Sequence, residues 1–244
     1  MRVDLRFLET ALHRVAVLYY EPRRPRGVTL VVGHGYSSSK HNLDFLCNFL
    51  ASHGFAAYSL DFPGHKLGAS TGRLSSLDDL IDAMGSVVEQ ARDDGARVVY
   101  TVGHSMGATT AILTAAADRS IAGVVAIATG LGRLPALDAL GLRGATDLRS
   151  SYVDGLSLPE LLAQTDTRLE AALPALAGRP QLYVAGERDG MVAPRSVRAL
   201  FDAASEPKTF ETIASDHTYA GENARSTVLA WLGALHPRET ATRA

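Results

Sequence analysis

Short runs of apolar residues recur along this chain, and their spacing predicts β-strands. Apolar and polar positions alternate from Val3 to Leu8 and from His13 to Tyr20, which indicates two strands that open the chain as a hairpin. Later runs are more continuously apolar, as is typical of strands buried on both faces of a sheet. They occupy residues 28–32, 55–61, 97–102, 121–128 and 181–186, and 208–213 is the last expected strand.

Segments with helical spacing separate these strands. Leu43 to His53 has this spacing and ends before Gly54, a residue that favours a helix C-terminus. Ser76 and Asp79 have the spacing of a capping box, so we expect a helix from there to about Asp93. Further helices are expected at 108–117, from Pro194 onward and at 227–235. Strands that alternate with helices predict an α/β fold, with a mostly parallel sheet and helices on both faces.

Residues 130–177 interrupt this alternation. They contain several leucines, Gly and Pro breaks, and no β-branched run. Because the segment is too long for a bare loop, we interpret it as a small helical lid inserted between two strands. The whole chain, residues 1–244, is then expected to be one domain that carries this insertion.

Composition narrows the class of protein further. The 244 residues are 46% hydrophobic, with a formal net charge of −2, so no broad basic field favours nucleic acid or stable membrane association. Cys47 is the one cysteine and falls in an apolar stripe, which favours a buried thiol and excludes an intrachain disulfide. The N-terminus lacks the apolar core of a signal peptide, and a cytoplasmic protein is expected.

The stretch GHSMG (103–107) holds the first candidate for chemistry. The pattern G-x-S-x-G occurs readily by chance, so its surroundings decide. Here it lies between an expected strand and an expected helix, at the strand end where α/β proteins bind ligands. Glycines at 103 and 107 would let the chain turn sharply with the Ser105 hydroxyl exposed. Ser105 is therefore a candidate nucleophile, and the Met106 N–H a candidate oxyanion donor at the helix N-terminus.

A serine nucleophile needs a base and an acid that orients the base. His217 follows the last expected strand, and Asp189 follows the strand before it. The order Ser105, Asp189, His217 matches that of the nucleophile-elbow hydrolases. Asp216 is a rival acid, but its side chain should point away from that of its neighbour His217.

These motifs together resemble the α/β-hydrolases, in particular small bacterial carboxylesterases and monoacylglycerol-lipase-like enzymes. The resemblance covers nearly the whole chain through VVGHGY, LDFPGH, GHSMG, GERDGMV and SDHTY. It implies that the Tyr36 N–H is the second oxyanion donor. The turn after Asp61 departs from the family, since GHKLGAS replaces a shorter G-H-G-x-S, and this can alter one wall of the site.

Histidines inside the motifs have structural interpretations. His34 is expected to fix the oxyanion loop by hydrogen bonding, His104 to pack beneath the nucleophile turn, and His65 to be structural as well. None of the eight histidines has acidic or cysteine partners at metal-ligand spacing, so no metal and no cofactor is expected. VVGHGYSS also has a G-x-G after a strand, but Ser38 replaces the third glycine of a dinucleotide loop.

The expected reaction is hydrolysis of a carboxylic ester through an acyl-enzyme, as in serine carboxylesterases and lipases. Leucines of the insertion could form an apolar acyl pocket, with Leu134, Leu158 and Leu162 as the chosen lining residues; they could equally pack the insertion onto the domain. The other apolar candidates are Leu137, Leu140, Leu142, Tyr152, Leu156 and Leu161.

Other functions remain compatible with this sequence. No fixed positive site for a carboxylate or a CoA phosphate is evident, although Arg133, Arg143 and Arg149 keep a thioesterase open. Amidases and C–C bond hydrolases share the same fold and residues. A small-molecule receptor that retains the three residues is the alternative outside enzymes, and it would bind its ligand stoichiometrically. The expected partner in each case is a small molecule, an ester for the favoured reading.

Overall fold

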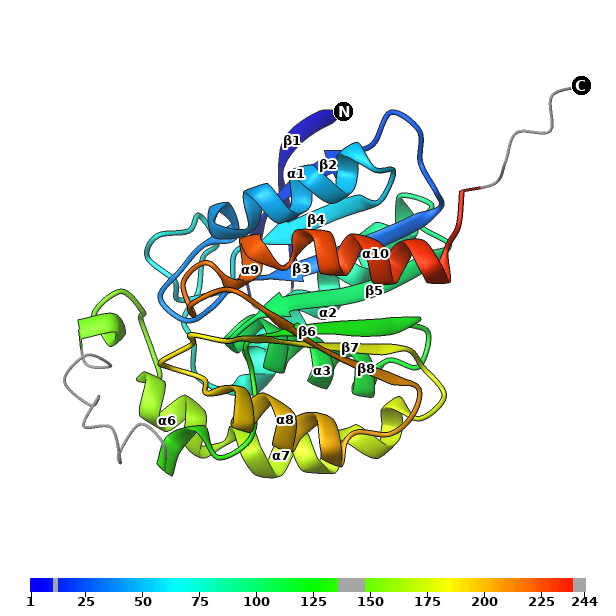
Figure 1. Cartoon of the computed structure of the whole chain (residues 1–244). Coiled ribbons are helices and arrows are strands. Elements are labelled where there is room, and N and C mark those ends of the chain that lie inside the picture. Colours follow the sequence, from blue (N-terminus) through cyan, green and yellow to red (C-terminus); the bar gives the residue numbers. More distant parts are fainter. Residues whose placement is uncertain (11–12, 136–147, 239–244) are drawn as a thin grey trace, which may run out of the picture.

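The structure is a computed structural model that describes residues 1–10, 13–135 and 148–238 (Figure 1). One eight-stranded sheet runs through the molecule in the order β1-β2-β4-β3-β5-β6-β7-β8. The strands are β1 (Arg2–Glu9), β2 (Arg14–Glu21), β3 (Val28–Gly33), β4 (Ala56–Leu60), β5 (Val98–His104), β6 (Gly123–Ile127), β7 (Gln181–Gly186) and β8 (Lys208–Ile213). Each strand expected from the sequence is present, with bounds that shift by a few residues.

Pairing directions divide the sheet into two parts. β1 pairs antiparallel with β2 over its full length, which confirms the opening hairpin, and β2 pairs antiparallel with β4. From β4 through β8 all neighbouring strands are parallel. The carboxyl ends of these six strands therefore lie along one edge of the sheet.

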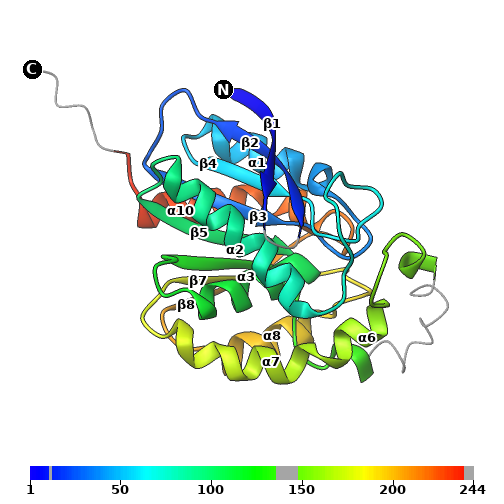
Figure 2. The same cartoon turned by 180° about the vertical axis from the view of Figure 1, so that it is seen from behind.

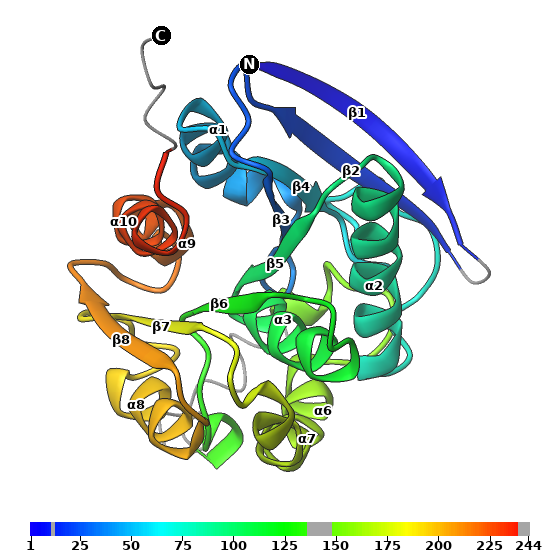
Figure 3. The same ribbon diagram turned by 90° about the vertical axis from the view of Figure 1, so that its right-hand side faces the viewer.

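Helices cover both faces of the sheet, as the alternating pattern predicted (Figure 3). Apolar residues of α1, α9 and α10 form one core with one face, and those of α2, α3, α7 and α8 form a larger core with the other. Seen from behind, α2 and α3 lie across the sheet (Figure 2). The bounds are α1 (Asp44–Ser52), α2 (Leu77–Asp93), α3 (Met106–Ala117), α7 (Thr165–Ala172), α8 (Pro194–Ala203), α9 (Ala220–Asn223) and α10 (Arg225–Leu235).

The start of α2 follows directly from the sequence. Ser76 precedes the helix with extended backbone, and its hydroxyl accepts a hydrogen bond from the Asp78 N–H. The Asp79 carboxylate accepts in return from the Ser76 N–H at 2.8 Å. The predicted capping box is confirmed. The helix expected at 43–53 is confirmed as α1, and a 3-10 turn, Lys40–Leu43, precedes it.

Between β6 and β7 the chain makes the helices α6 (Leu158–Ala163) and α7, followed by a 3-10 turn at Leu173–Leu176. This is the segment in which the insertion is expected, and residues 136–147 of it lie outside the described residues. Isolated bridges pair His65 with Val153 and Leu74 with Gly155. The segment is thus tied to the long turn that follows β4. In the described ranges, no helix is long and apolar enough to cross a membrane.

Candidate active site

Ser105 occupies a sharp turn between β5 and α3. Its φ of 54° lies in the left-handed region, a costly conformation for a residue with a side chain. A Cβ on Gly103 would lie 2.1 Å from the Gly107 carbonyl carbon, and one on Gly107 would lie 2.1 Å from the Gly33 oxygen. Only glycine fits at both positions, so the two glycines of the motif are required by this backbone.

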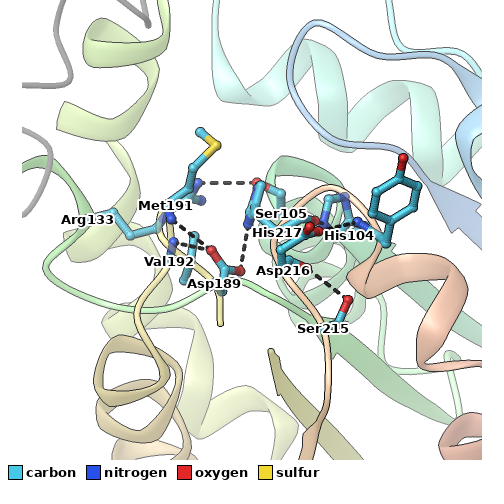
Figure 4. Close-up of polar contacts among 10 residues, drawn as sticks. His104, Ser105, Arg133, Asp189, Met191, Val192, Ser215, Asp216 and His217 are labelled. Carbon is cyan, nitrogen blue, oxygen red and sulfur yellow. Dashed lines mark hydrogen bonds and ion pairs between the residues drawn. The ribbon is translucent and has the colours of Figure 1, made fainter. Parts of the chain in front are cut away.

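A chain of hydrogen bonds joins Ser105 to His217 and Asp189 (Figure 4). The His217 Nε2 lies 3.1 Å from the Ser105 Oγ, and the His217 Nδ1 lies 2.8 Å from the Asp189 Oδ2. The ionised carboxylate can only accept, so Nδ1 carries the proton and the neutral Nε2 accepts from the serine hydroxyl. This is the geometry in which a histidine can act as a general base toward a serine.

Backbone donors hold Asp189 in place. Its Oδ1 accepts from the N–H groups of Met191 at 2.9 Å and Val192 at 2.7 Å. Burial alone would raise the pKa of Asp189, but the hydrogen bond and charge of His217 and these two N–H groups outweigh it and lower the pKa below its usual range. The carboxylate therefore stays ionised beside the imidazole at neutral pH.

Asp216, the rival acid, has a different partner. Its Oδ1 accepts from the Tyr219 N–H at 3.0 Å. The bond caps the turn that leads into α9, and no hydrogen bond or ion pair joins Asp216 to the His217 ring in the described part of the chain. Asp189 is the acid that contacts the imidazole.

The loop after β3 passes directly over the nucleophile. A Cβ on Gly35 would lie 3.5 Å from the Ser105 Cβ. His34 fixes this loop, because its Nδ1–H donates to the Gly35 carbonyl at 2.8 Å and its Nε2 accepts from the Phe62 N–H at 3.0 Å. Tyr36 follows, with its hydroxyl donating to the Leu156 carbonyl at 2.8 Å. Its backbone therefore lies next to the nucleophile turn.

Met106 begins α3, and its N–H is one of the first-turn donors that a helix leaves without an intrahelical partner. The Tyr36 and Met106 N–H groups thus come from the two segments that flank Ser105. Their role as oxyanion donors stays a prediction.

His104 lies beneath the elbow and supports the base. Its Nε2–H donates to the His217 carbonyl at 2.8 Å, and the two rings are 4.8 Å apart. Burial, followed by the charge of His217, lowers the pKa of His104 to about 3, so this ring stays neutral. His65 is buried too, and its Nδ1 lies 3.0 Å from the Pro63 carbonyl.

A cavity of about 280 Å³ opens above Ser105. Its lining combines apolar and polar residues and includes two arginines. The lining residues are Gly35, Tyr36, Ser37, Ser38, Asn42, Leu67, His104, Ser105, Arg133, Leu148, Arg149, Tyr152, Leu158, Met191, His217 and Thr218.

The leucines expected to line an acyl pocket are distributed differently. Leu158 lines the cavity, whereas Leu162 lies beside a separate space of only about 10 Å³. Leu134 is partly buried and packs against the larger core. Leu137, Leu140 and Leu142 lie outside the described residues.

The sequence did not predict that Arg133 would lie beside Ser105. Arg133 is 5% exposed, and its Nη2 donates to the Ser105 Oγ at 3.3 Å. Arg133 follows β6 at the edge of the sheet where the other site residues gather, and that position was the one available signal. The sequence marked no fixed positive site in this segment and kept Arg133 open, and the structure places its guanidinium beside Ser105. Arg149 lines the same cavity, and Arg143 lies outside the described residues.

The unusual turn after β4 encloses a buried ion pair. The Lys40 Nζ lies 2.6 Å from the Asp61 Oδ2, and both side chains are at most 4% exposed. Asp61 also accepts from the N–H groups of Lys40 and Ala69, each at 2.7 Å. A Cβ on Gly68 would lie 2.6 Å from the Asp61 carboxyl carbon, so the longer turn wraps closely around this carboxylate. The Lys40–Asp61 ion pair therefore joins the segment that follows β3 to the end of β4.

Metal ligation finds no support among the residues placed by the structure, which contain no group of three or more His, Cys, Asp or Glu that could hold an ion.

The sheet, the elbow and the three hydrogen-bonded residues define an α/β-hydrolase. The model of the family described as serine aminopeptidase, S33, matches residues 23–171, more than half of the chain. The chain belongs to this family and is a hydrolase of the α/β-hydrolase fold. A search of curated proteins gave no match.

Solved structures share this fold at low sequence identity. The Pyrococcus furiosus esterase Pf2001 has a TM-score of 0.75 and 19% identity, over 96% of this chain and 89% of the esterase. A variant of the N-acyl homoserine lactonase AidH, complexed with N-hexanoyl homoserine, has a TM-score of 0.69 and 19% identity, over 99% and 100%. A serine hydrolase homologue from Coxiella burnetii has a TM-score of 0.69 and 17% identity, over 94% and 97%.

Proposed function

We propose that this protein is a serine esterase that hydrolyses short- to medium-chain or aromatic carboxylic esters through an acyl-enzyme. The observation that carries the proposal is the Ser105–His217–Asp189 chain, with heavy-atom separations of 3.1 and 2.8 Å. All three residues are at most 7% exposed, so water competes little for these hydrogen bonds.

Acylation begins when the Ser105 Oγ attacks the ester carbonyl carbon and its proton passes to the His217 Nε2. Asp189 holds the imidazole in the required tautomer and stabilises the imidazolium. The N–H groups of Tyr36 and Met106 stabilise the negative oxygen of the tetrahedral intermediate. His217 then donates its proton to the departing alkoxide, and the alcohol leaves.

Deacylation repeats these steps with water. His217 removes a proton from water as its oxygen attacks the acyl carbon, and the proton returns to Ser105 when the acid departs. The cavity of about 280 Å³ lies at the small end of the range for ligand sites, which supports short acyl groups in preference to long ones.

Steady-state hydrolysis of p-nitrophenyl esters from acetyl to palmitoyl tests the proposal, with Ser105→Ala measured in parallel. We expect many turnovers per protein, an optimum at a short chain, and a loss on the order of 10⁴- to 10⁶-fold in Ser105→Ala. Near-normal activity in Ser105→Ala would disprove the assignment.

If no ester is hydrolysed but a fluorophosphonate still labels Ser105, the nucleophile is retained and the substrate is another acyl compound, such as a thioester or an amide. Binding of one ligand per protein without turnover would instead identify a receptor.

A further inference from the structure

Arg133 brings a buried positive charge to the nucleophile. Its Nη2 lies 3.3 Å from the Ser105 Oγ, and the side chain is 5% exposed. A guanidinium carries five N–H donors, yet the Nε is buried and lacks a hydrogen-bond partner within the described ranges. Arg133 also lines the cavity above Ser105. The cavity therefore has a strong donor, in fixed contact with the reacting atom, that has capacity for a further partner.

The backbone that leads to Arg133 is specialised to hold it there. Ala128, directly after β6, has a φ of 54°, and Gly132 has a φ of 69°. A Cβ on Gly130 would lie 2.3 Å from the Ser196 backbone, so this stretch packs tightly against the start of α8. The Gly132 N–H donates to the Asp166 Oδ2 at 2.8 Å. Gly132 adopts its positive φ freely, but the conformation of Ala128 persists only when its surroundings impose it, so the guanidinium is positioned before any ligand arrives.

The charge of Arg133 is incompletely neutralised. Across the described ranges no carboxylate forms an ion pair with it within 4.0 Å. Asp189, which is hydrogen-bonded to His217, and Asp166, whose Oδ2 accepts from Gly132 and whose buried Oδ1 lacks a hydrogen-bond partner there, attract it from further away. Burial lowers the pKa of Arg133 to about 10, which leaves it protonated at neutral pH. A buried cation without a close counter-ion is unfavourable, and an entering anion relieves this cost.

Space near Arg133 limits the size of that anion. The guanidinium also borders the space of about 10 Å³ beside Met106 and Leu162, which is too small for an alkyl chain. In the acyl-enzyme the carbonyl carbon is bonded to the Ser105 Oγ. A group that reaches a guanidinium only 3.3 Å from that oxygen must therefore lie a few bonds from the scissile carbonyl.

We infer that Arg133 binds the free carboxylate of the substrate's acyl group, so that the ester cleaved at Ser105 is a hemi-ester of a short dicarboxylic acid. Planar guanidinium and planar carboxylate pair through two parallel hydrogen bonds, which a neutral acyl group cannot form. The inference rests on the proposed esterase function and specifies its substrate class.

The test compares two esters of nearly equal shape, monomethyl succinate and methyl 4-methylpentanoate, with acid release followed by titration. Wild type should hydrolyse the hemi-ester with the higher kcat/KM. In Arg133→Met the ratio of the two kcat/KM values should fall about 100-fold, because one partner of a buried charge pair is removed. Arg149→Met, which removes a second arginine of the same cavity, should change the ratio less than about threefold, since a partly exposed charge is screened.

Arg133→Lys provides a second variant should Arg133→Met not fold, as judged by circular dichroism. It keeps the charge and loses the paired hydrogen bonds, so the ratio should fall about tenfold. Equal kcat/KM for the two esters in wild type would overturn the inference. A loss in Arg133→Met that is the same for both esters would overturn it too, because it would mean that Arg133 serves the reaction itself.

Binding separates this inference from the proposed function. If wild type cleaves neither ester, the esterase assignment fails, and calorimetry with Ser105→Ala decides on Arg133. Monomethyl succinate that binds at least about tenfold more weakly when Arg133→Met is added supports the carboxylate site. Equal binding with and without Arg133 refutes it.

Discussion

At Gly103 and Gly85 the same one-methyl change should have opposite effects. A Cβ on Gly103 would meet the Gly107 backbone at 2.1 Å, whereas one on Gly85, within α2, meets nothing within 4 Å. Gly103→Ala should therefore destabilise the fold by about 3 kcal/mol or more. Gly85→Ala should stabilise it by about 1 kcal/mol, because alanine is the better helix former. Chemical denaturation measures both, and equal stability of the two variants would contradict the packing described for the elbow.

Asp189 and Asp216 provide a second pair of matched substitutions. Asp189→Asn keeps the shape of the side chain but donates to the His217 Nδ1, which places the imidazole in the wrong tautomer. We expect kcat for the proposed ester hydrolysis to fall on the order of 10⁴-fold. Asp216→Asn retains the oxygen that accepts from Tyr219, so kcat should stay within about threefold of wild type. Similar losses in both variants would contradict the assignment of Asp189 as the acid.

How far single residues could be predicted depends on whether their role is local. The Ser105 turn could be found because its glycines lie two residues away on either side. The candidates His217 and Asp189 could be found because each directly follows an expected strand, in the chain order of the nucleophile-elbow hydrolases. The position of Arg133 could not be predicted, because its burial against Ser105 depends on the packing of residues 128–132 on α8. The Lys40–Asp61 pair also joins distant parts of the chain, and no local spacing reveals it.

At the scale of helices and strands, the buried Lys40–Asp61 ion pair connects the 3-10 turn before α1 with the end of β4. Lys40→Met leaves the Asp61 carboxylate buried without its cation, and we expect a loss of about 3–5 kcal/mol in the free energy of unfolding. The exposed pair Arg198–Asp202 is the matched control. Arg198→Met there should cost no more than about 0.5 kcal/mol. A small effect in both variants would show that the buried pair adds little to stability.

The pH dependence of this pair has a definite sign. Burial acts to raise the pKa of Asp61, but the hydrogen bonds from Lys40 and Ala69 outweigh it, and the pKa lies below its usual value. The contribution of Asp61 is therefore present above the unfolded pKa of about 3.9 and is lost as pH falls toward the folded pKa. Unfolding measured from pH 7 to pH 3 should show the gap between wild type and Lys40→Met narrowing as pH falls, because the buried Asp61 carboxylate takes up a proton more readily in the variant, which lacks the cation. A gap that stays constant would exclude Asp61 as its source.

Helices and strands could be predicted from the sequence where the pattern of apolar and polar residues was strong. The strands and the capped helix α2 follow from apolar runs and from Ser76 with Asp79, which are local signals. The split into α6 and α7 was not predicted, because that segment has weak periodicity and depends on contacts with the turn after β4.

Across the whole molecule, the position of a strand in the sheet should set its protection against hydrogen exchange. β6 is buried along its entire length, whereas β1 forms an edge and leaves Val3, Leu5 and Phe7 at least 40% exposed. Amides of β5 and β6 should exchange slowest, near the rate of global unfolding, and those of β1 fastest. Exchange followed by mass spectrometry measures this order. Equal protection of β1 and β5 would mean that β1 is covered in solution.

The site as a whole is assembled from loops that follow five parallel strands. Tyr36 follows β3, Ser105 follows β5, Arg133 follows β6, Asp189 follows β7 and His217 follows β8 (Figure 1). Since all five loops lie at one edge of the sheet, residues as far apart in the sequence as Ser105 and His217 come into contact. The order of the strands thus accounts for the arrangement.

The contact between Gly107 and the Gly33 carbonyl has a consequence for evolution. Backbone packs directly on backbone there, with no side chain between α3 and the oxyanion loop. Ser105 is therefore held by a turn in which a side chain at Gly103 or Gly107 would clash with backbone. Arg133, Arg149 and Leu158, from the described part of the segment between β6 and β7, supply a different wall of the cavity. Natural selection can replace side chains on that wall one at a time and change which molecules are accepted, while the chemistry performed on them stays the same.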